Sequence, residues 1–388
     1  MNLVELACRW FGHLESSLVY SVVCISHLSS NFPNSHPQCQ LCCVLLFMMS
    51  IVKALAITVG CLSVVVSALR KHSAVGSALP AGESQVTVSG RRVVIHNPGR
   101  SGSLPLVLGL HGWYGSATDR GSFCGAANIA EHSSSLGFIG VCPDGYRVEN
   151  AGSWNAAGCC GNSVDDDVDD VQFLRDVVSY VKQHASISKV YAMGHSNGAM
   201  MTFRLACEAS DIIDGVAPIN GGWFGSPAFN VIRSHPLPNG WHRTNFECSS
   251  EANSSQSVSC SSCYDYASSP SDNRCWKSKT FSCTAPAANF PMLYIHGEND
   301  QEEPYELVVA GFHHYAQEVL GCGGLATSPN YIEGKAKCFE YASCSEGRRV
   351  TFCSVRGMGH SVPARRENFD GVRAAWSWFH GGWPSLAA

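Results

Sequence analysis

The sequence predicts a three-layer α/β fold, in which helices cover both faces of a mostly parallel central sheet. Two observations predict it. Short apolar runs that end in turn residues alternate with amphipathic segments along most of the chain, which is the pattern of strands and helices in sheets of this kind. In addition, a serine, an aspartate and a histidine each follow one of these runs, and active sites form at the carboxyl ends of parallel strands.

The first half of the fold begins with an expected hairpin. Ser84–Gly99 alternates between polar and apolar residues, which predicts a β-hairpin at the edge of the sheet. Leu104–Gly112 and Gly137–Gly145 are short apolar runs that end in turn residues, as buried parallel strands do. Asp169–His184 places its apolar residues on one face and opens with acidic residues, so we expect an amphipathic helix.

The second half continues the alternation. Val190–Met193 predicts a buried strand, and the segment 199–207, which lacks Gly and Pro and has apolar residues at helical spacing, predicts a helix. Further strands are expected within 290–300 and 348–360, a helix over 305–320 between them, and a closing helix around 365–380.

The turn between the strand and the helix at Ser196 is the first candidate for chemistry. It reads G-H-S-N-G over residues 194–198, but this pattern arises by chance about once in every two chains of such composition, and a glycine-rich turn is the alternative. A serine on a sharp turn can project toward a base. The N–H of Asn197, at the start of the helix, would then face a developing oxyanion.

Candidate partners of Ser196 also follow predicted strands. Asp300 comes after the strand within 290–300, and His360 comes after the strand within 348–360. The chain order serine, aspartate, histidine is that of the α/β-hydrolases. For the acid, Glu298, Glu302 and Glu303 are rivals of Asp300.

The second oxyanion donor is expected at the end of an early strand. His111 and Gly112 end the run Leu104–Gly112, so the loop that follows can present the N–H of Trp113 beside that of Asn197. His360 would take the proton of Ser196, and the serine oxygen would attack an ester carbonyl.

Residues 1–68 are expected to lie outside the mature protein. Residues 1–48 show no clear periodicity and are interpreted as a gene-model extension, whereas residues 49–68 have the basic, apolar and small-residue parts of a secretory signal peptide. The alternative is a membrane anchor over 41–69. Arg70 and Lys71 follow this stretch on the side that would be exported, which favours the signal peptide. Residues 69–388 are expected to form one secreted catalytic domain, with no stable membrane association.

Cysteine usage agrees with export. Fourteen cysteines follow Ala68, and an even, large number in an exported chain predicts a disulfide framework. Five of them lie in a polar segment, 225–288, which we interpret as a Cys-rich insertion near the active site or, alternatively, as a stapled surface loop. Because five is odd, at least one bridge should tie this segment to the rest of the domain. Asn253 in the same segment begins a glycosylation sequon.

The composition excludes other classes of function. With 388 residues, 45% of them hydrophobic, the chain can bury a large core. Its net charge of −5 gives no basic footprint for nucleic acid. Cys260 and Cys263 have zinc-ligand spacing, but no second pair stands at such spacing. We therefore expect no metal and no cofactor.

Six ordered motifs resemble one family, the secreted α/β-hydrolase esterases that include poly(3-hydroxybutyrate) depolymerases and feruloyl and acetyl xylan esterases. The motifs are LHGWYG, CPDGY, GSWNAAGCCG followed by VDDVQFL, GHSNGAMM, YIHGEND and GMGHSVP. The resemblance implies that Ser196, Asp300 and His360 form a catalytic triad, and that Cys159 and Cys160 are disulfide-tied near the site. Ala199 and Val362 depart from the family pattern, and the segment 225–288 has no counterpart.

The predicted substrate is an ester of plant cell-wall polysaccharide, with feruloyl ahead of acetyl and a hydroxyalkanoate oligomer next. Aromatic side chains on predicted loops can stack on a phenolic acyl group or a sugar, although each can equally be a packing residue. The candidates for substrate contact are Trp113, Tyr114, Trp154 and Trp223. A different class stays open, a catalytically inactive secreted binding protein on the same scaffold.

Overall fold

The computed structural model describes residues 78–119, 123–125, 129–149, 151–157, 159–222, 241–244, 263–266, 283, 285–303, 305–362 and 369–383. The chain divides into two compact units, Met1–Gly76 and Ser77–Ala388, and all of these residues belong to the second. The predicted gene-model extension, 1–48, and signal peptide, 49–68, lie outside the described residues. So does most of the Cys-rich segment 225–288, including Asn253, Cys260 and the predicted glycan site.

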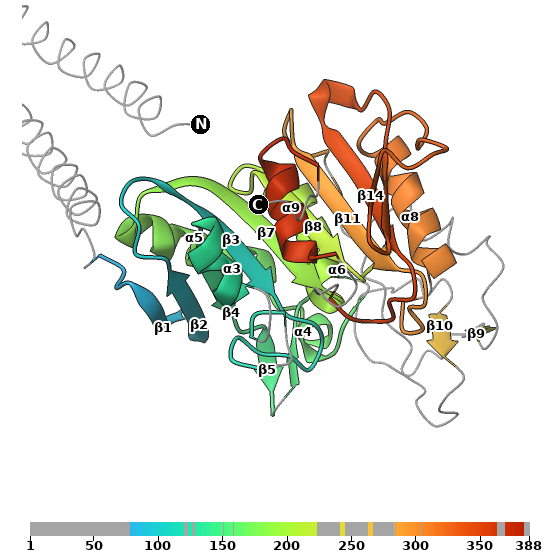
Figure 1. Cartoon of the computed structure of the whole chain (residues 1–388). Helices are drawn as coiled ribbons and strands as arrows, with labels where there is room; N and C mark the ends of the chain where they lie inside the picture. Colours follow the sequence, from blue (N-terminus) through green and yellow to red (C-terminus); the bar gives the residue numbers. More distant parts are fainter. Residues whose placement is uncertain are drawn as a thin grey trace, which may run out of the picture. The chain divides into compact units, whose positions relative to one another are not determined.

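A ten-stranded sheet forms the centre of this unit (Figure 1). Its six central strands, from β4 to β14, run parallel, while both edges are antiparallel hairpins. The strands are, in spatial order, β1 (Gly82–Val88), β2 (Arg91–Asn97), β4 (Ile139–Pro143), β3 (Leu104–Leu110), β7 (Ile187–His195), β8 (Gly215–Ile219), β11 (Pro291–Gly297), β14 (Arg349–Val355), β13 (Ala336–Glu340) and β12 (Tyr331–Glu333).

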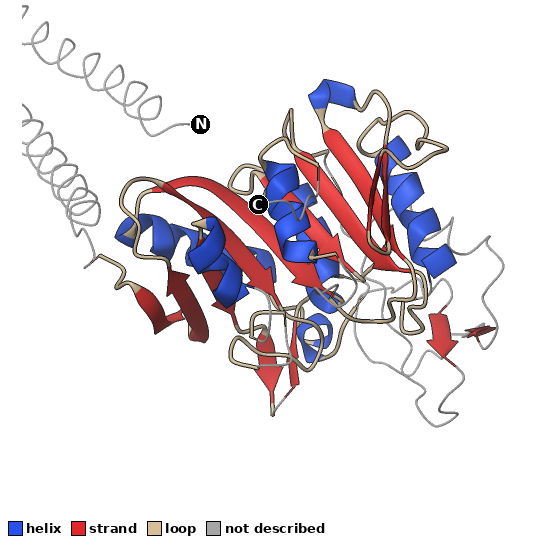
Figure 2. Ribbon diagram, in the orientation of Figure 1, coloured by secondary structure: helices blue, strands red, loops and turns tan. Residues whose placement is uncertain are grey.

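Helices cover both faces of the sheet, which confirms the predicted three-layer α/β fold (Figure 2). On one face lie α5 (Asp170–His184), α6 (Asn197–Glu208) and α8 (Tyr305–Glu318), whose apolar residues share one core cluster. On the other face lie α3 (Ile129–Leu136) and α9 (Gly371–Phe379). The short helix α4 (Asn162–Asp165) and the 3-10 turn η1 (Ser345–Gly347) lie in connections.

Strand β3 shows why the central runs are apolar throughout. Leu106, Leu108 and Leu110 pack into the cluster on the α5, α6 and α8 face, and Val107 packs into the opposite cluster. Helices cover both faces of the sheet, so side chains that point to either face are buried. The sequence of the strand is therefore a continuous apolar run.

The predicted elements are present, with shorter bounds at several ends. The edge hairpin expected over 84–99 is the antiparallel pair β1 and β2. The expected helix over 169–184 is α5, and its N-cap is Asp169, whose side chain accepts the N–H of Gln172. The closing helix expected from 365 is α9, which begins after Asp370 because that carboxylate accepts the N–H of Arg373.

Several elements were not predicted. The sheet extends by the hairpin β12–β13 at its second edge, and β5 (Tyr146–Val148) pairs with β6 (Ala151–Ser153) in a separate small hairpin. Within the Cys-rich segment, β9 (Trp241–Thr244) pairs with β10 (Cys263–Tyr266).

Five disulfides lie in the described part of the chain and confirm the expected framework. They are Cys124–Cys142, Cys159–Cys160, Cys207–Cys283, Cys322–Cys344 and Cys338–Cys353. Cys283 belongs to the segment 225–288 and Cys207 belongs to α6, so the predicted bridge from this segment to the rest of the domain is present.

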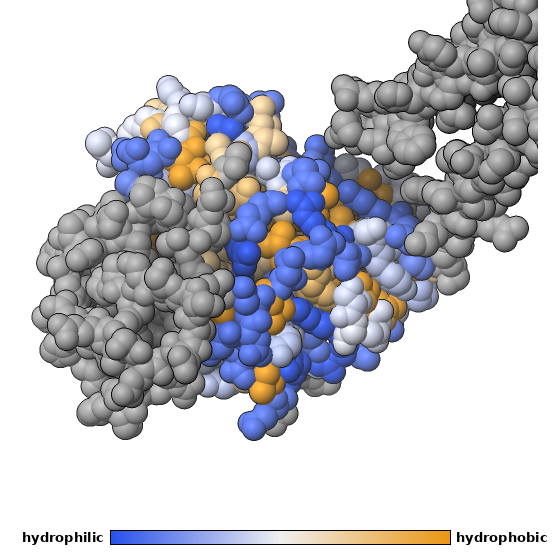
Figure 3. All heavy atoms as spheres, turned by 180° about the vertical axis from the view of Figure 1, so that it is seen from behind, coloured by the Kyte–Doolittle hydropathy of each residue, from blue (hydrophilic) through white to orange (hydrophobic). Residues whose placement is uncertain are grey.

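One face of the described part of the chain can be judged by its hydropathy. On the face shown in Figure 3, hydrophilic residues dominate and hydrophobic ones are scattered among them, and single apolar residues on a surface are ordinary. In the described ranges, no helix is both long and apolar enough to cross a membrane.

Candidate active site

The parallel strands bring four chain segments to one edge of the sheet. Gly112 follows β3, Ser196 follows β7, Asp300 follows β11 and His360 follows β14. Because these strands are parallel neighbours, their carboxyl ends lie at the same edge. These residues lie up to 248 positions apart in the sequence, and the sheet brings them to the same edge.

Ser196 occupies a strained turn between β7 and α6. Its backbone has φ 55° and ψ −124°, a conformation that side chains other than Gly rarely adopt. The N–H of Ser196 donates to the carbonyl of Ile219 at 3.0 Å, which ties the turn to β8. The turn thus holds the serine at the end of the strand, at the start of the helix.

The glycines on both sides of Ser196 are required by close backbone contacts. A Cβ on Gly194 would lie 2.2 Å from the carbonyl oxygen of Gly198, and a Cβ on Gly198 would lie 2.2 Å from the carbonyl oxygen of Leu110. Both distances are far below van der Waals contact, so neither position accepts a side chain. The pattern G-x-S-x-G therefore has a steric cause in this chain.

His360 is oriented by Asp300. Its Nδ1 lies 2.8 Å from Asp300 Oδ2. The other carboxylate oxygen of Asp300 accepts the N–H groups of Glu302 and Glu303, at 3.0 and 2.9 Å. Among the four acids considered from the sequence, Asp300 is the one that makes this hydrogen bond, while Glu298 instead accepts a bond from the Ser354 hydroxyl.

Three carboxylates surround the His360 imidazole. Burial lowers its pKa, but the hydrogen bond with Asp300 and the charges of Asp300, Glu302 and Glu303 outweigh burial, so the pKa is raised above 6.5. His360 can therefore hold a proton more readily than a histidine in water.

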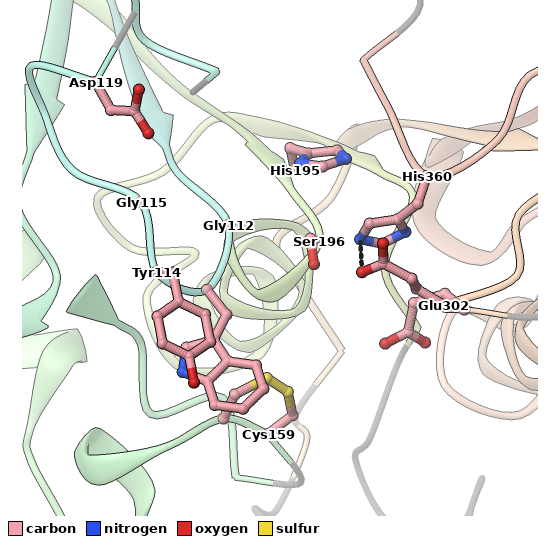
Figure 4. Close-up of a pocket in the computed structure, with 12 residues that line it drawn as sticks. Gly112, Tyr114, Gly115, Asp119, Cys159, His195, Ser196, Glu302 and His360 are labelled. Atoms are coloured by element: carbon pink, nitrogen blue, oxygen red, sulfur yellow. Dashed lines mark ion pairs between the residues drawn. A yellow bond between two sulfur atoms is a disulfide. The ribbon is translucent and has the colours of Figure 1, made fainter. Parts of the chain in front are cut away.

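Ser196 and His360 line one cavity of about 540 Å³ (Figure 4). In Figure 4 their side chains face the same space, with Tyr114 and the Cys159 disulfide at another side of it. Among the described residues Ser196 makes no hydrogen bond to His360, and such bonds are often long in structures without substrate. The lining residues are Gly112, Trp113, Tyr114, Gly115, Asp119, Cys159, Cys160, His195, Ser196, Glu302, Glu303 and His360.

The loop after β3 is held close to Ser196 by His111. Its Nδ1–H donates to the carbonyl of Gly112 at 2.7 Å, and its Nε2 accepts the N–H of Gly145 at 2.9 Å. Burial lowers the pKa of His111 to about 4, so the ring is neutral and its tautomer is set by these two bonds. A Cβ on Gly112 would lie 3.2 Å from the Cβ of Ser196, so the loop backbone touches the serine.

Asn197 connects the serine turn to the loop that carries the vicinal disulfide. Its side-chain oxygen accepts the N–H of Trp154 at 2.7 Å, and its amide donates to the carbonyls of Trp154 and Cys159 at 3.0 and 3.1 Å. As the first residue of α6, Asn197 has a backbone N–H with no partner inside the helix. That donor is available to an oxygen at the helix N-terminus.

The chain is similar to several known proteins. Residues 68–220, which include the loop after β3 and Ser196, match the family model described as Chlorophyllase. The chain is 23% identical over 299 residues to feruloyl esterase B of Piromyces equi, in an alignment that covers 73% of this chain and 45% of that protein. It is 34% identical over 136 residues to the putative esterase NocK of Nocardia uniformis subsp. tsuyamanensis, over 34% of this chain and 37% of that protein.

The chain has a three-layer α/β fold, and both curated relatives are named as esterases. It spans less than half the length of the two curated relatives it matches. Among solved structures it is similar to an acetyl xylan esterase from Aspergillus awamori, with a TM-score of 0.49 and 15% identity, covering 77% of this chain and 99% of that one.

The structure places only some of the predicted aromatic residues at the cavity. Trp113 and Tyr114 line the cavity with their ring centroids 4.5 Å apart, and Tyr114 is 60% exposed. Trp154 does not line it: its indole is fully buried, and its Nε1–H donates to the carbonyl of His111 at 2.9 Å. The prediction that Trp154 contacts substrate is therefore corrected, because the ring supports the loop from beneath. Trp223 lies outside the described residues.

Among the cavity residues that were not predicted to contact substrate are His195, Glu302 and Glu303. Burial lowers the pKa of His195 to about 3, and its Nε2 is buried without a hydrogen-bond partner among the described residues. Burial raises the pKa of Glu303 to about 8. The sequence offers one indication of their position: His195 is next to Ser196, and Glu302 and Glu303 closely follow Asp300. Within the described ranges no cluster of His, Cys, Asp or Glu could hold a metal ion.

Proposed function

We propose that this protein is a secreted serine esterase that hydrolyses carboxylic esters through an acyl-enzyme. The observation that carries the proposal is that Ser196, on its strained turn, lines the same cavity as His360, whose Nδ1 is hydrogen-bonded to Asp300. A nucleophile, a base and an orienting acid in one cavity are the parts that such a reaction needs.

The proposed reaction has two halves. His360 Nε2 takes the Ser196 proton while the serine oxygen attacks the ester carbonyl, and the proton then passes to the departing alcohol. In the second half His360 takes a proton from water, and the hydroxide attacks the acyl carbon. The bond from that carbon to the serine oxygen breaks, and Ser196 regains its proton from His360. Asp300 stabilises the imidazolium that forms in each half.

Two backbone N–H groups are proposed to hold the oxyanion. One is that of Asn197 at the N-terminus of α6, where the helix dipole adds a favourable potential. The other is that of Trp113, in the loop that contacts Ser196 through Gly112. His111, Trp154 and the Asn197 side chain fix this loop and this turn relative to each other.

The proposed substrate is a feruloyl ester of plant cell-wall xylan. The tilted Trp113 and Tyr114 rings at the cavity offer a stacking surface for a phenolic acyl group, and a similar protein is a feruloyl esterase. Acetylated xylan and 3-hydroxybutyrate oligomers are the second candidates, because their acyl groups also fit a cavity of this volume. Secretion, through residues 49–68, is part of the proposal, and five disulfides support it.

The test uses the chain expressed in an oxidising host, with Ser196→Ala as control. A fluorophosphonate should label the wild-type chain and leave Ser196→Ala unlabelled, because the reagent requires an activated serine. Release from methyl ferulate, acetylated xylan and 3-hydroxybutyrate oligomers should be fastest with methyl ferulate. Absence of labelling of the folded, disulfide-intact chain would overturn the esterase proposal in favour of a binding protein. Fast oligomer hydrolysis with negligible ferulate release would overturn only the substrate.

A further inference from the structure

The charged lining of the cavity is acidic. Asp119, Glu302 and Glu303 are its carboxylates, and no Lys or Arg belongs to the lining that the structure describes. A cavity lined by one sign of charge, with partly apolar walls, focuses the potential on whatever enters it. A charged substrate therefore interacts electrostatically with the carboxylates of the cavity.

Glu302 lies beside the imidazole of His360. Its Oε2 is 3.7 Å from His360 Nε2, the nitrogen proposed to exchange a proton with Ser196. Its side chain is 75% exposed, so it stands at the open side of the cavity (Figure 4). The backbone N–H of Glu302 donates to Asp300 at 3.0 Å, which fixes the position of the residue beside the imidazole.

Glu303 differs from Glu302 in its surroundings. It is half-buried, its carboxylate accepts the N–H of Gly222, and desolvation raises its pKa to about 8. Glu302 instead stands at the exposed side of the cavity, with its carboxylate 3.7 Å from His360 Nε2.

From this geometry we infer that Glu302 determines specificity by charge: its carboxylate, beside the imidazole, makes the cavity discriminate against esters whose acyl group carries a negative charge. The inference rests on the proposed esterase function. The same charge favours release of the product, because hydrolysis of the acyl-enzyme yields the serine hydroxyl, a proton and a carboxylate anion, which Glu302 repels.

The test compares two substrates that differ in charge and little in size, p-nitrophenyl hemisuccinate and p-nitrophenyl methyl succinate. The quantity measured is the ratio of kcat/KM for the neutral ester to that for the anionic ester, at pH 7 and low salt. We expect Glu302→Gln to lower this ratio by about 3- to 10-fold, as a single charge several ångströms away does in partly aqueous surroundings, and Glu302→Lys to lower it further. Added salt should lower the wild-type ratio.

The ratio of the two kcat/KM values does not depend on the ionisation of His360. Both substrates meet the same free enzyme, so a change in the His360 pKa alters both values of kcat/KM equally. Glu318→Gln is the matched control, because Glu318 is an exposed acid at the far end of α8, and it should leave the ratio unchanged.

The outcomes separate this inference from the proposed function. A ratio that is the same in the wild type, Glu302→Gln and Glu302→Lys overturns the role of Glu302, while turnover that is lost in Ser196→Ala still supports the esterase. Turnover that persists in Ser196→Ala overturns the proposed function itself. A ratio that falls equally in Glu318→Gln shows a general effect of net charge and also overturns the inference.

Discussion

At the scale of single residues, His360 shows how neighbours set the chemistry of one side chain. Its Nδ1 is hydrogen-bonded to Asp300, and its Nε2 lies 3.7 Å from Glu302. Burial opposes the charged imidazolium, but these carboxylates together with Glu303 outweigh it and raise the pKa. A general base must be unprotonated to act, so the raised pKa should shift the pH dependence of the reaction.

We predict that kcat/KM for a neutral ester falls at acid pH with a midpoint above 6.5. Below the pKa of His360 the imidazolium dominates, and the rate drops about tenfold for each pH unit. The measurement is the pH profile of kcat/KM between pH 5 and 9. In Glu302→Gln the midpoint should move to lower pH, because one of the charges that raise the pKa is gone.

Asp300→Asn serves as the control for this profile. An amide cannot stabilise the imidazolium, so kcat should fall by about 10³- to 10⁴-fold and the midpoint should shift down more than in Glu302→Gln. A midpoint that is the same in all three proteins would contradict the assignment of this limb to His360.

At the scale of elements, a buried hydrogen-bonded pair of side chains joins two helices on one face of the sheet. Nε2 of His132, in α3, lies 2.7 Å from Oδ2 of Asp370, the N-cap of α9, and both side chains are almost fully buried. Asp370 also accepts the N–H of Arg373 at 3.0 Å. Burial raises the Asp370 pKa, but the hydrogen bonds from His132 and Arg373 outweigh it, so the pKa is lowered.

Asp370→Ala should lower the free energy of unfolding at pH 7 by about 3 kcal/mol, because it removes a helix cap and a hydrogen bond of the buried His132. Asp370→Asn, which can still cap the helix, should lose less. Denaturant unfolding measures both.

The pH dependence of this loss has a definite sign. A carboxylate whose pKa is lowered by folding stabilises the protein above its unfolded pKa of about 3.9, and that stabilisation disappears as pH falls through the folded value. The difference between wild type and Asp370→Ala should therefore narrow below about pH 4. A difference that grows toward acid pH would contradict a stabilising role for the Asp370 carboxylate.

At the scale of the whole molecule, disulfides connect segments that are far apart in the sequence and reinforce one edge of the sheet. Cys207–Cys283 joins α6 to the end of the Cys-rich segment across 76 positions, and Cys322–Cys344 spans 22 positions. Cys338 and Cys353 are directly paired partners in β13 and β14, so their bridge fastens the edge hairpin to the parallel sheet.

The paired replacement Cys207→Ala with Cys283→Ala should lower the free energy of unfolding by about 4 kcal/mol, because the bridge restricts a long loop in the unfolded chain. The matched pair Cys322→Ala with Cys344→Ala closes a shorter loop and should cost about 1 kcal/mol less. Urea titration of both variants gives the comparison, and the opposite order would show that strain or packing in the native state dominates.

The sequence by itself determined the architecture and the candidates for the triad. The central strands are apolar because both faces are covered, and α5 repeats its apolar residues with the helical period. Both patterns involve residues that are close in the sequence, so they can be recognised without a structure. The glycines beside Ser196 mark its turn for the same reason, since the backbone there has no room for a side chain.

Only the tertiary structure decided which side chains meet. It selected Asp300 among four nearby acids, placed Trp154 beneath the site instead of in the cavity, and put Glu302 beside His360. It also added the hairpin β12–β13 at the edge of the sheet. Burial and contact across 60 to 250 positions depend on how the layers pack, and no local pattern of residue types records that.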